Sequence, residues 1–419
     1  MRTLVPSLVL ALLTTGLLPG AALAKSAPPA GTGPDTALVQ LGAPERGLRA
    51  FVAWPTVRAK APGIVVAHEW WGLNDQIRGV ARRLAHEGYV AIVPDLYHGD
   101  VATDAETAHE LSRALEDESA VEDLDAAADW LRKQPGMSDR KLGVIGFCMG
   151  GGLSQRLALH TWTLDATPLA EALRIARATG WDGVELRRLD FKRAEESGKP
   201  ADSVLDLVRA SGLPVACVGV EFGWMWSDGP ERKRLLDVFD EQCRRAAALG
   251  CTTVMSPVDK DRGDVARAVS SAREVGDIAA RHGVRLALEF NSQCAQLNTL
   301  SAVREITSRA AHPHVGLLLD TYHLGRSGAT LKQVDEVAPA EIAYVQFSDP
   351  PRTGLEPGKA LDRLPPGQGS YTFREFFALM SSKGYAGFAS YEAPNAAAWK
   401  RDPNDVAREA LAATRAVLP

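Results

Sequence analysis

Residues 141–165 read KLGVIGFCMGGGLSQRLALHTWTLD, and two folding patterns follow one another within this stretch. Residues 142–147 form a short continuous apolar run, which is typical of a buried parallel strand. Gly146-Phe147-Cys148-Met149-Gly150 then fits the G-x-nucleophile-x-G pattern, in which glycines permit a sharp turn from strand to helix and lift the nucleophile out of the sheet. A second apolar run, residues 157–161, follows after a short connection. The stretch therefore predicts the end of one α/β unit and the start of another.

The length and charge of the chain limit what it can be. A chain of 419 residues suits two domains. The net charge of −5, without a stripe of Lys and Arg, argues against nucleic acid as a partner. The five cysteines are odd in number and match no disulfide or zinc spacing, so only Cys148 has a chemical context.

The N-terminus has the features of an export signal. Arg2 supplies a positive charge, residues 4–18 are apolar, and residues 22–24 (ALA) form a small-x-small cleavage site. The apolar run is short for a membrane span. We therefore expect a signal peptide over residues 1–24, a linker over 25–35, a periplasmic or secreted protein, and no stable membrane insertion after cleavage; an uncleaved anchor is the alternative.

The first domain is expected over residues 36–155. Short apolar runs alternate with segments of helical periodicity, and this alternation predicts an α/β sheet. The expected strands are 48–54, 63–67, 89–94 and 142–147, and the expected helices are 75–86, 104–115 and 121–133.

Three segments of this half resemble the dienelactone hydrolase family: VVAHEWWGLN (65–74), VPDLYHG (93–99) and GFCMGGG (146–152). The resemblance implies that Cys148 is the nucleophile and that Glu69 interacts with it. In the family an Asp and a His further along the chain complete the triad, but here a new pattern begins directly after the cysteine. A thiol without a base loses its activation, and residues 142–147 are left at the edge of a truncated sheet. Residual hydrolysis of esters or lactones by Cys148 and Glu69 is the alternative.

The second half repeats a strand, a helix and a helix-ending glycine through to the C-terminus. Eight such units predict a (β/α)8 TIM barrel over residues 156–419, so the whole chain is expected to be a partial α/β-hydrolase sheet followed by a TIM barrel. The expected strands are 157–161, 183–186, 215–222, 252–256, 285–290, 315–320, 342–347 and 387–391.

Polar residues end four consecutive barrel strands, where active sites of such barrels lie. They are Glu289, Asp320, Gln346 and Glu392. Carboxylate and amide oxygens suit a hard divalent cation, so we expect a metal site with Mg²⁺ or Mn²⁺. His160, Glu185 and Glu221 end the first three strands, where they either line the pocket or serve as structural hydrogen-bonding groups; Trp224 and Trp226 either wall a sugar ring or pack against a helix.

This constellation resembles the xylose isomerase-like barrel superfamily of sugar isomerases, epimerases and dehydratases. The resemblance implies metal ligation by Glu289, Asp320 and Glu392, and substrate contact by His323 in the D-x-x-H pattern. Arg363, ahead of residues 365–369 (PPGQG), resembles an arginine that contacts substrate oxygens. One departure is Gln346, because many epimerases of the family carry histidine there.

The predicted function is therefore a divalent-metal-dependent isomerase or epimerase, with dehydration as a variant, acting on a sugar, keto-sugar or cyclic polyol. Glu289 and Glu392 are the predicted catalytic pair, one removing the proton next to a carbonyl and the other returning it. The alternatives are the cysteine hydrolase, a non-enzymatic sugar-acid-binding protein and a non-functional fusion. The expected partner is a small molecule and not nucleic acid, and self-association into a homo-oligomer stays open.

Overall fold

The computed structural model describes residues 34–42, 47–57, 61–135, 137–146, 155–354 and 361–418. The expected signal peptide and Cys148 lie outside the described residues. The chain divides between Gln155 and Arg156 into two compact units, with Phe377–Ala386 and Leu418–Pro419 grouped with the first. None of the described helices is long and apolar enough to cross a membrane.

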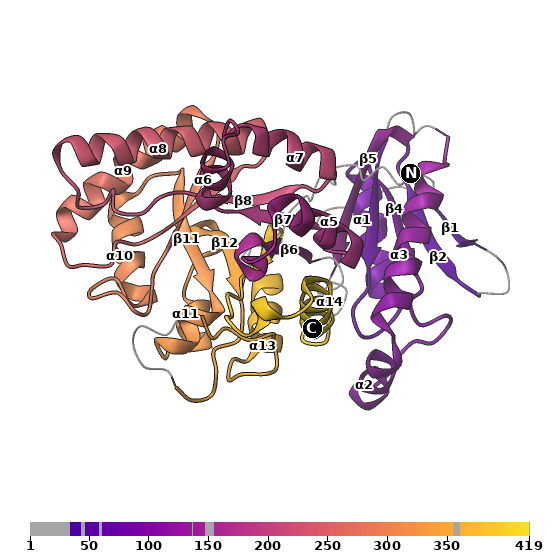
Figure 1. The fold of residues 1–419 in the computed structure, drawn as a ribbon. Helices are drawn as coiled ribbons and strands as arrows, with labels where there is room; N and C mark the ends of the chain where they lie inside the picture. The colour runs from indigo at the N-terminus through magenta and orange to yellow at the C-terminus, as the bar shows by residue number, and fades with distance from the viewer. Residues whose placement is uncertain are drawn as a thin grey trace, which may run out of the picture. The chain divides into compact units, whose positions relative to one another are not determined.

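The first unit is built on a five-stranded mixed sheet in the order β1-β2-β4-β3-β5 (Figure 1). β1 and β2 are antiparallel, as are β2 and β4, whereas β3 runs parallel to both β4 and β5. The strands are β1 (Asp35–Gln40), β2 (Arg49–Trp54), β3 (Ala61–Ala67), β4 (Val90–Pro94) and β5 (Met137–Gly146); the helices are α1 (Asp75–His86), α2 (Ala105–Ala114) and α3 (Asp117–Arg132).

Both faces of this sheet are covered because successive strand residues point to opposite sides. In β3, Val65 belongs to a buried cluster that includes Leu131 of α3. Its neighbours Ile64 and Val66 belong to a second cluster that includes Ile77 of α1. The continuous apolar runs of the sequence therefore become strands buried on two sides.

The expected strands and helices of this unit are confirmed, and one strand was missed. β1 was not predicted, because the burial of DTALVQ alternates weakly and Leu38 is 54% exposed. The expected edge strand is confirmed as far as Gly146, because β5 pairs only with β3 among the described residues; Phe147 lies outside them.

The second unit is a closed barrel of eight parallel strands, in which β13 pairs with β6 to complete the ring. The eight expected strands are all present, so the predicted fold class is confirmed. The strands are β6 (Arg156–His160), β7 (Gly183–Leu186), β8 (Val215–Gly219), β9 (Thr253–Pro257), β10 (Arg285–Glu289), β11 (Val315–Asp320), β12 (Ile342–Phe347) and β13 (Phe388–Tyr391).

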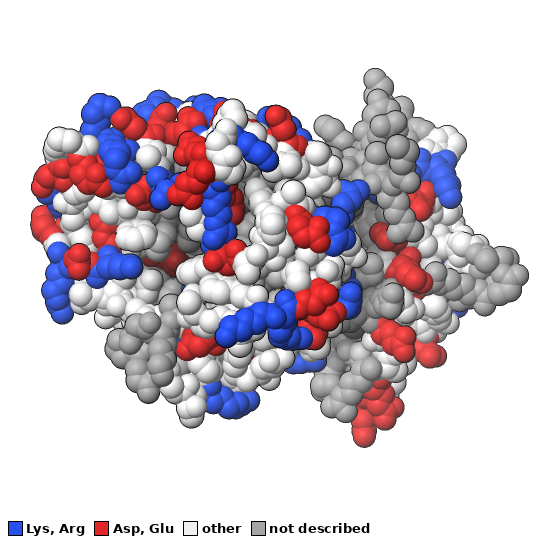
Figure 2. Space-filling model, in the orientation of Figure 1, with Lys and Arg blue, Asp and Glu red and all other residues white. Residues whose placement is uncertain are grey.

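Helices cover the outside of the barrel (Figure 1). They are α5 (Leu169–Thr179), α6 (Arg188–Glu196), α7 (Ser203–Ser211), α8 (Gly229–Ala248), α9 (Val265–Arg281), α10 (Leu300–Ala310), α11 (Thr321–Arg326), α12 (Leu331–Asp335), α13 (Phe373–Ser382) and α14 (Pro403–Arg415). Figure 2 shows positive and negative side chains interleaved over the region of α8 and α9. Pairs such as Arg234–Glu231 and Arg281–Asp240 account for this mixture.

The barrel interior is filled with side chains. Small residues such as Ala158 and Ala287 form one buried cluster with Tyr344 and Phe388. The large aromatic side chains pack beside the alanines and fill the centre of the barrel, as in other barrels of eight strands. The polar residues of the site lie at the carboxyl ends of the same strands, so this apolar layer forms the floor beneath them.

Candidate active site

The four predicted metal ligands lie at the ends of four neighbouring strands. Glu289 ends β10, Asp320 ends β11, Gln346 is the penultimate residue of β12, and Glu392 directly follows β13. All four are buried. Asp320 and Gln346 are paired in register, so the two side chains start from adjacent positions of the ring.

His323 lies among the predicted ligands. One ligand atom each of Glu289, Asp320 and His323 lies within 4.8 Å of the others, a spacing that could hold a metal ion. His323 Nε2 is 3.7 Å from Glu289 Oε1 and 3.9 Å from Asp320 Oδ2. The other imidazole nitrogen of His323, Nδ1, is 2.9 Å from Ser292 Oγ. The sequence did not predict this contact. His323 is thus as well placed to bind a metal as to contact a substrate.

Arg363 joins two of the carboxylates. Its Nη1 donates to Asp320 Oδ2 at 2.9 Å and to Glu392 Oε2 at 2.7 Å. Its guanidinium also lies over the ring of Tyr322, 4.3 Å from the centroid. Burial alone would lower the pKa of Arg363, but the carboxylates of Glu392, Asp320 and Glu289 raise it above its ordinary value. Arg363 therefore stays charged and partly neutralises the acidic cluster.

The segment that carries Arg363 is fastened to the end of β12 by Asp349. Asp349 and Leu364 exchange two backbone hydrogen bonds. The carboxylate of Asp349 accepts from the backbone N–H groups of Gly369 and Tyr371, at 2.7 and 2.9 Å. A Cβ on Gly369 would lie 2.1 Å from the carbonyl oxygen of Pro350, so this close approach requires glycine.

Glu185 and Gln346 form a second buried pair. Gln346 Nε2 donates to Glu185 Oε1 at 2.8 Å, and the Tyr344 hydroxyl donates to Oε2 at 3.1 Å. His160 Nε2 lies 3.6 Å from Glu185 Oε1 and 3.4 Å from Glu392 Oε1. Burial, aided by the charge of Glu392, raises the pKa of Glu185 to about 8. Of the two roles left open for His160 and Glu185, the structure favours a place at the site.

Burial sets the protonation of the other titratable groups. Burial and the nearby Glu392 and Asp320 charges raise the pKa of Glu289 well above its ordinary value. Burial lowers the pKa of His323 to about 3, and it lowers that of His160 well below the ordinary range. Both imidazoles are therefore neutral at pH 7, and Glu289 is able to hold a proton.

Two oxygens of the site are buried without a hydrogen-bond partner among the described residues: Glu289 Oε1 and Gln346 Oε1. A buried polar atom without a partner is costly. Oxygen donors of this kind are also the ligands that hard divalent cations take. The donor set therefore fits a divalent metal ion.

Glu221, expected at the end of the third barrel strand, and the two tryptophans that follow it have contacts typical of structural residues. Glu221 forms ion pairs with Arg188 and Arg234. Trp224 is fully buried, and its indole N–H donates to Ser256 Oγ. Trp226 packs against Gly263, where an added Cβ would meet the indole at 2.3 Å. Both tryptophans thus have packing contacts, which is one of the two roles left open for them.

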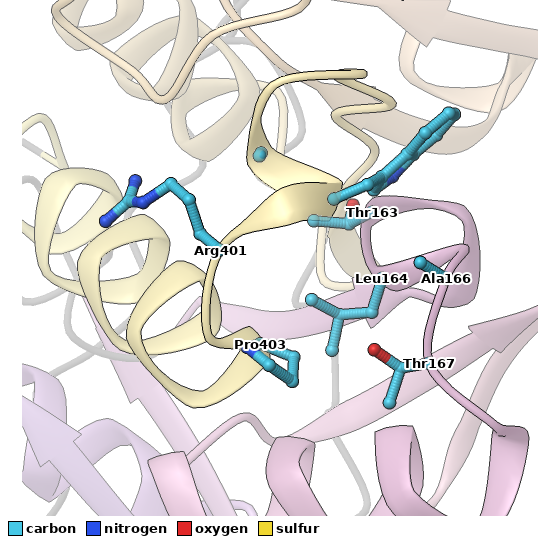
Figure 3. A pocket seen from close by; sticks show the side chains of 8 residues that line it. Thr163, Leu164, Ala166, Thr167, Arg401 and Pro403 are labelled. Atoms are coloured by element: carbon cyan, nitrogen blue, oxygen red, sulfur yellow. The ribbon is translucent and has the colours of Figure 1, made fainter.

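A small cavity lies beside the loop that follows β6 (Figure 3). Thr163, Leu164 and Ala166 line it on one side, and Arg401 and Pro403 on the other. The Thr163 hydroxyl donates to the carbonyl of Tyr391, which ties the turn after the first barrel strand to the last strand. None of the predicted site residues lines this cavity, so we regard it as part of the barrel closure.

In the first unit, Glu69 follows β3 and is half-buried. Its neighbour His68 accepts a hydrogen bond from the Leu96 N–H at Nε2, and burial lowers the pKa of His68 to about 4. His98 and buried Asp123 form a close pair, with 2.7 Å between Nε2 and Oδ2. Because Cys148 lies outside the described residues, its relation to Glu69 stays a prediction.

Comparisons with known proteins agree with this division. A model of the xylose isomerase-like TIM barrel family matches residues 173–417, and a model of the dienelactone hydrolase family matches residues 48–170. The chain thus carries a dienelactone hydrolase-like segment followed by a xylose isomerase-like barrel, as its motifs predicted.

Individual relatives cover different parts of the chain. Carboxymethylenebutenolidase of Pseudomonas putida is 33% identical over 153 residues, which are 34% of this chain and 59% of that protein. The chain spans about half the length of the first such relatives. Inosose isomerase of Halalkalibacterium halodurans is 23% identical over 238 residues, 55% of this chain and 84% of that protein.

Among solved structures, the IolI protein with a bound zinc atom is similar to this chain. Its TM-score is 0.58 at 20% identity, over 63% of this chain and 98% of that one. At this identity the likeness shows the fold.

Proposed function

The chain belongs to the xylose isomerase-like TIM barrel family, and we propose that its barrel is a divalent-metal-dependent isomerase or epimerase of a sugar or cyclic polyol. The observation that carries the proposal is the buried Oε1 of Glu289. This oxygen has no hydrogen-bond partner among the described residues, although Asp320 and His323 lie beside it.

Glu289, Asp320, Glu392 and the amide oxygen of Gln346 would hold the ion. A bound divalent ion would polarise the substrate carbonyl and acidify the adjacent C–H group. Because these four donors are oxygens, they favour Mg²⁺ or Mn²⁺. Ligation by His323 Nε2 in addition would make the site more favourable to zinc.

Glu289 and Glu392 would move the proton. One oxygen of the Glu289 carboxylate would hold the ion, and the other would accept the proton from carbon. Arg363 fixes Oε2 of Glu392 by its hydrogen bond. His323, neutral at pH 7, would hydrogen-bond a substrate hydroxyl or carbonyl oxygen. Return of the proton to the opposite face gives epimerisation, return to the neighbouring carbon gives isomerisation, and loss of a hydroxyl gives dehydration.

Metal content tests the ligand assignment. Glu289→Gln and Asp320→Asn are expected to lower the bound metal measured after loading with Mn²⁺ and gel filtration. Glu221→Gln is the matched control, because Glu221 follows a barrel strand but pairs with surface arginines. Unchanged metal content in both site variants would show that the ligand set is wrong.

Proton exchange tests the chemistry whichever product is formed. The full chain is incubated in D₂O with Mn²⁺ and a panel of keto-sugars, inososes and dehydroshikimate, and the loss of C–H signals is followed by proton NMR. We expect exchange next to the carbonyl of one substrate class, its loss on chelation, and its loss in Glu289→Gln. C–H exchange that persists in Glu289→Gln, or that is unchanged by chelator, would contradict the mechanism.

A further inference from the structure

The two ends of the Gln346 amide have different surroundings. Nε2 donates to Glu185 Oε1 at 2.8 Å, whereas Oε1 is buried and has no hydrogen-bond partner among the described residues. Gln346 is fully buried, so an unpaired oxygen at this place is costly. The amide therefore has one end that is fixed and one end that is free to accept.

Glu185 decides which end is fixed. A side-chain amide donates from nitrogen and accepts at oxygen, and a carboxyl group, whether protonated or not, keeps at least one oxygen that accepts. Both Glu185 oxygens accept, one from Gln346 Nε2 and the other from the Tyr344 hydroxyl. An acceptor at this position holds the nitrogen end of the amide towards β7 and turns the oxygen end away from it.

Gln346 lies beside the proposed cation site in the ring of strands. Gln346 is paired in register with Asp320 on the neighbouring strand. Across the ring, His160 Nε2 lies within 3.6 Å of Glu185 Oε1 and 3.4 Å of Glu392 Oε1. The Glu185–Gln346 pair therefore borders two of the proposed ligands.

We propose that Glu185 is a positioning residue that orients the Gln346 amide so that its oxygen, and not its nitrogen, is presented as a ligand. The inference rests on the proposed metal site and assigns to Glu185 a specific effect on metal choice. Without this acceptor the amide can rotate, and its nitrogen end would then face a cation, which an N–H group cannot ligate.

The test is a double-mutant cycle on metal affinity, measured by titration of the chelated full chain with Mn²⁺. Glu185→Leu is expected to weaken Mn²⁺ binding by roughly 10- to 100-fold, the usual effect of losing an orienting partner. Gln346→Leu removes the ligand itself and is expected to weaken binding by at least as much. Because Glu185 acts through Gln346, the double variant is expected to bind no more weakly than Gln346→Leu alone. Tyr344→Phe is the matched control, since it removes the other hydrogen bond to Glu185 and leaves that of Gln346.

A second readout separates orientation from general support of the fold. Gln346→His is expected to shift preference from Mn²⁺ towards Zn²⁺ by at least 10-fold, because imidazole is a softer ligand and its second N–H finds Glu185 as a ready partner. A purely structural Glu185 would leave the Mn²⁺/Zn²⁺ ratio unchanged in Glu185→Leu. If Glu185→Leu does not fold, the same cycle is run with Glu185→Met, which keeps the length of the side chain and offers no strong acceptor.

Additive losses in the cycle, or unchanged Mn²⁺ affinity in the Glu185 variant, would overturn the inference and leave the metal site standing. Failure of the unsubstituted protein to bind Mn²⁺ would overturn the proposed function, and the inference with it. The two failures are therefore distinguishable in one set of titrations.

Discussion

The sheet of the first unit and the barrel of the second differ in how the ends of their strands are arranged. In the barrel every strand has two neighbours, so eight carboxyl ends converge on one ring and bring Glu289, Asp320 and Glu392 together from separate segments. In the first unit, β5 pairs only with β3 among the described residues. A closed sheet thus brings many strand ends, and the functional side chains at those ends, to one place. An open sheet brings fewer strand ends together.

The buried polar groups differ in the same way. In the barrel, one guanidinium serves two carboxylates while Glu289 Oε1 and Gln346 Oε1 have no partner among the described residues. In the first unit, His68 accepts from the backbone N–H of Leu96, but Asp95 Oδ1 is also buried without a hydrogen-bond partner among the described residues. Crowding of charged groups therefore distinguishes the barrel more than incomplete pairing does, and such crowding is typical of a functional site.

Separation of the two units is expected to give the largest effect. A fragment of residues 156–419 should fold cooperatively, whereas residues 36–157 should not, because the fragment ends with β5 as an edge strand. Thermal melts followed by circular dichroism check this. A cooperative, monomeric N-terminal fragment would contradict the truncation argument.

Glu392→Gln is expected to reduce metal-dependent proton exchange by roughly 10²- to 10⁴-fold, the usual contribution of a catalytic acid or base. The rate of C–H exchange in D₂O measures it. Cys148→Ala is the counterpart from the other unit and should leave the rate within a few-fold. If the cysteine variant loses activity while chelator has no effect, the chain is a hydrolase and the barrel is not its active half.

Arg363→Met is expected to destabilise the metal-free protein by roughly 3–5 kcal/mol, because it leaves Asp320 and Glu392 buried without their shared cation. Urea unfolding of the chelated protein measures the loss, and Mn²⁺ should restore part of it. Arg363→Lys keeps the charge and is expected to cost less. Equal stability of Arg363→Met and the unsubstituted protein would mean that the carboxylates do not depend on this arginine.

Gly369→Ala is expected to give the smallest of these effects, a loss of about 1–3 kcal/mol from the forced shift of the loop that carries Arg363. Gly219→Ala is the control, because a Cβ there has its nearest neighbour at 3.5 Å, an ordinary contact. The two unfolding free energies are compared directly, and equal values would show that the loop yields without cost.

Much of the fold was predictable, because the barrel strands are continuous apolar runs that local sequence defines. The run 215–222 was placed too long, since β8 ends at Gly219. Asp259 accepts hydrogen bonds from the N–H groups of Gly223 and Trp226 and so draws the following segment into a loop. β1 was missed because pairing with β2 defines it more than its own pattern does.

The ligand candidates were predictable because each ends an apolar run, but their partners were not. The bond from Gln346 to Glu185 joins β12 to β7, which are far apart in sequence and not adjacent in the ring. Arg363 donates to Asp320 from a loop that is held in place by a backbone hydrogen bond from Gly369 to the Asp349 carboxylate. Contacts of this kind depend on the closed geometry, which local patterns do not contain.

The pairing of β6 with β13 also has a consequence for how the protein is made. The ring closes between Arg156–His160 and Phe388–Tyr391, whose strands are more than 200 residues apart. At a translation rate of about 5–20 residues per second, β6 waits roughly 10–50 s on the ribosome before its last neighbour exists. During that interval β6 has an open edge, while every strand of the preceding sheet has already been synthesised. Slower translation would prolong this exposure, so the yield of native protein should depend on the rate of synthesis.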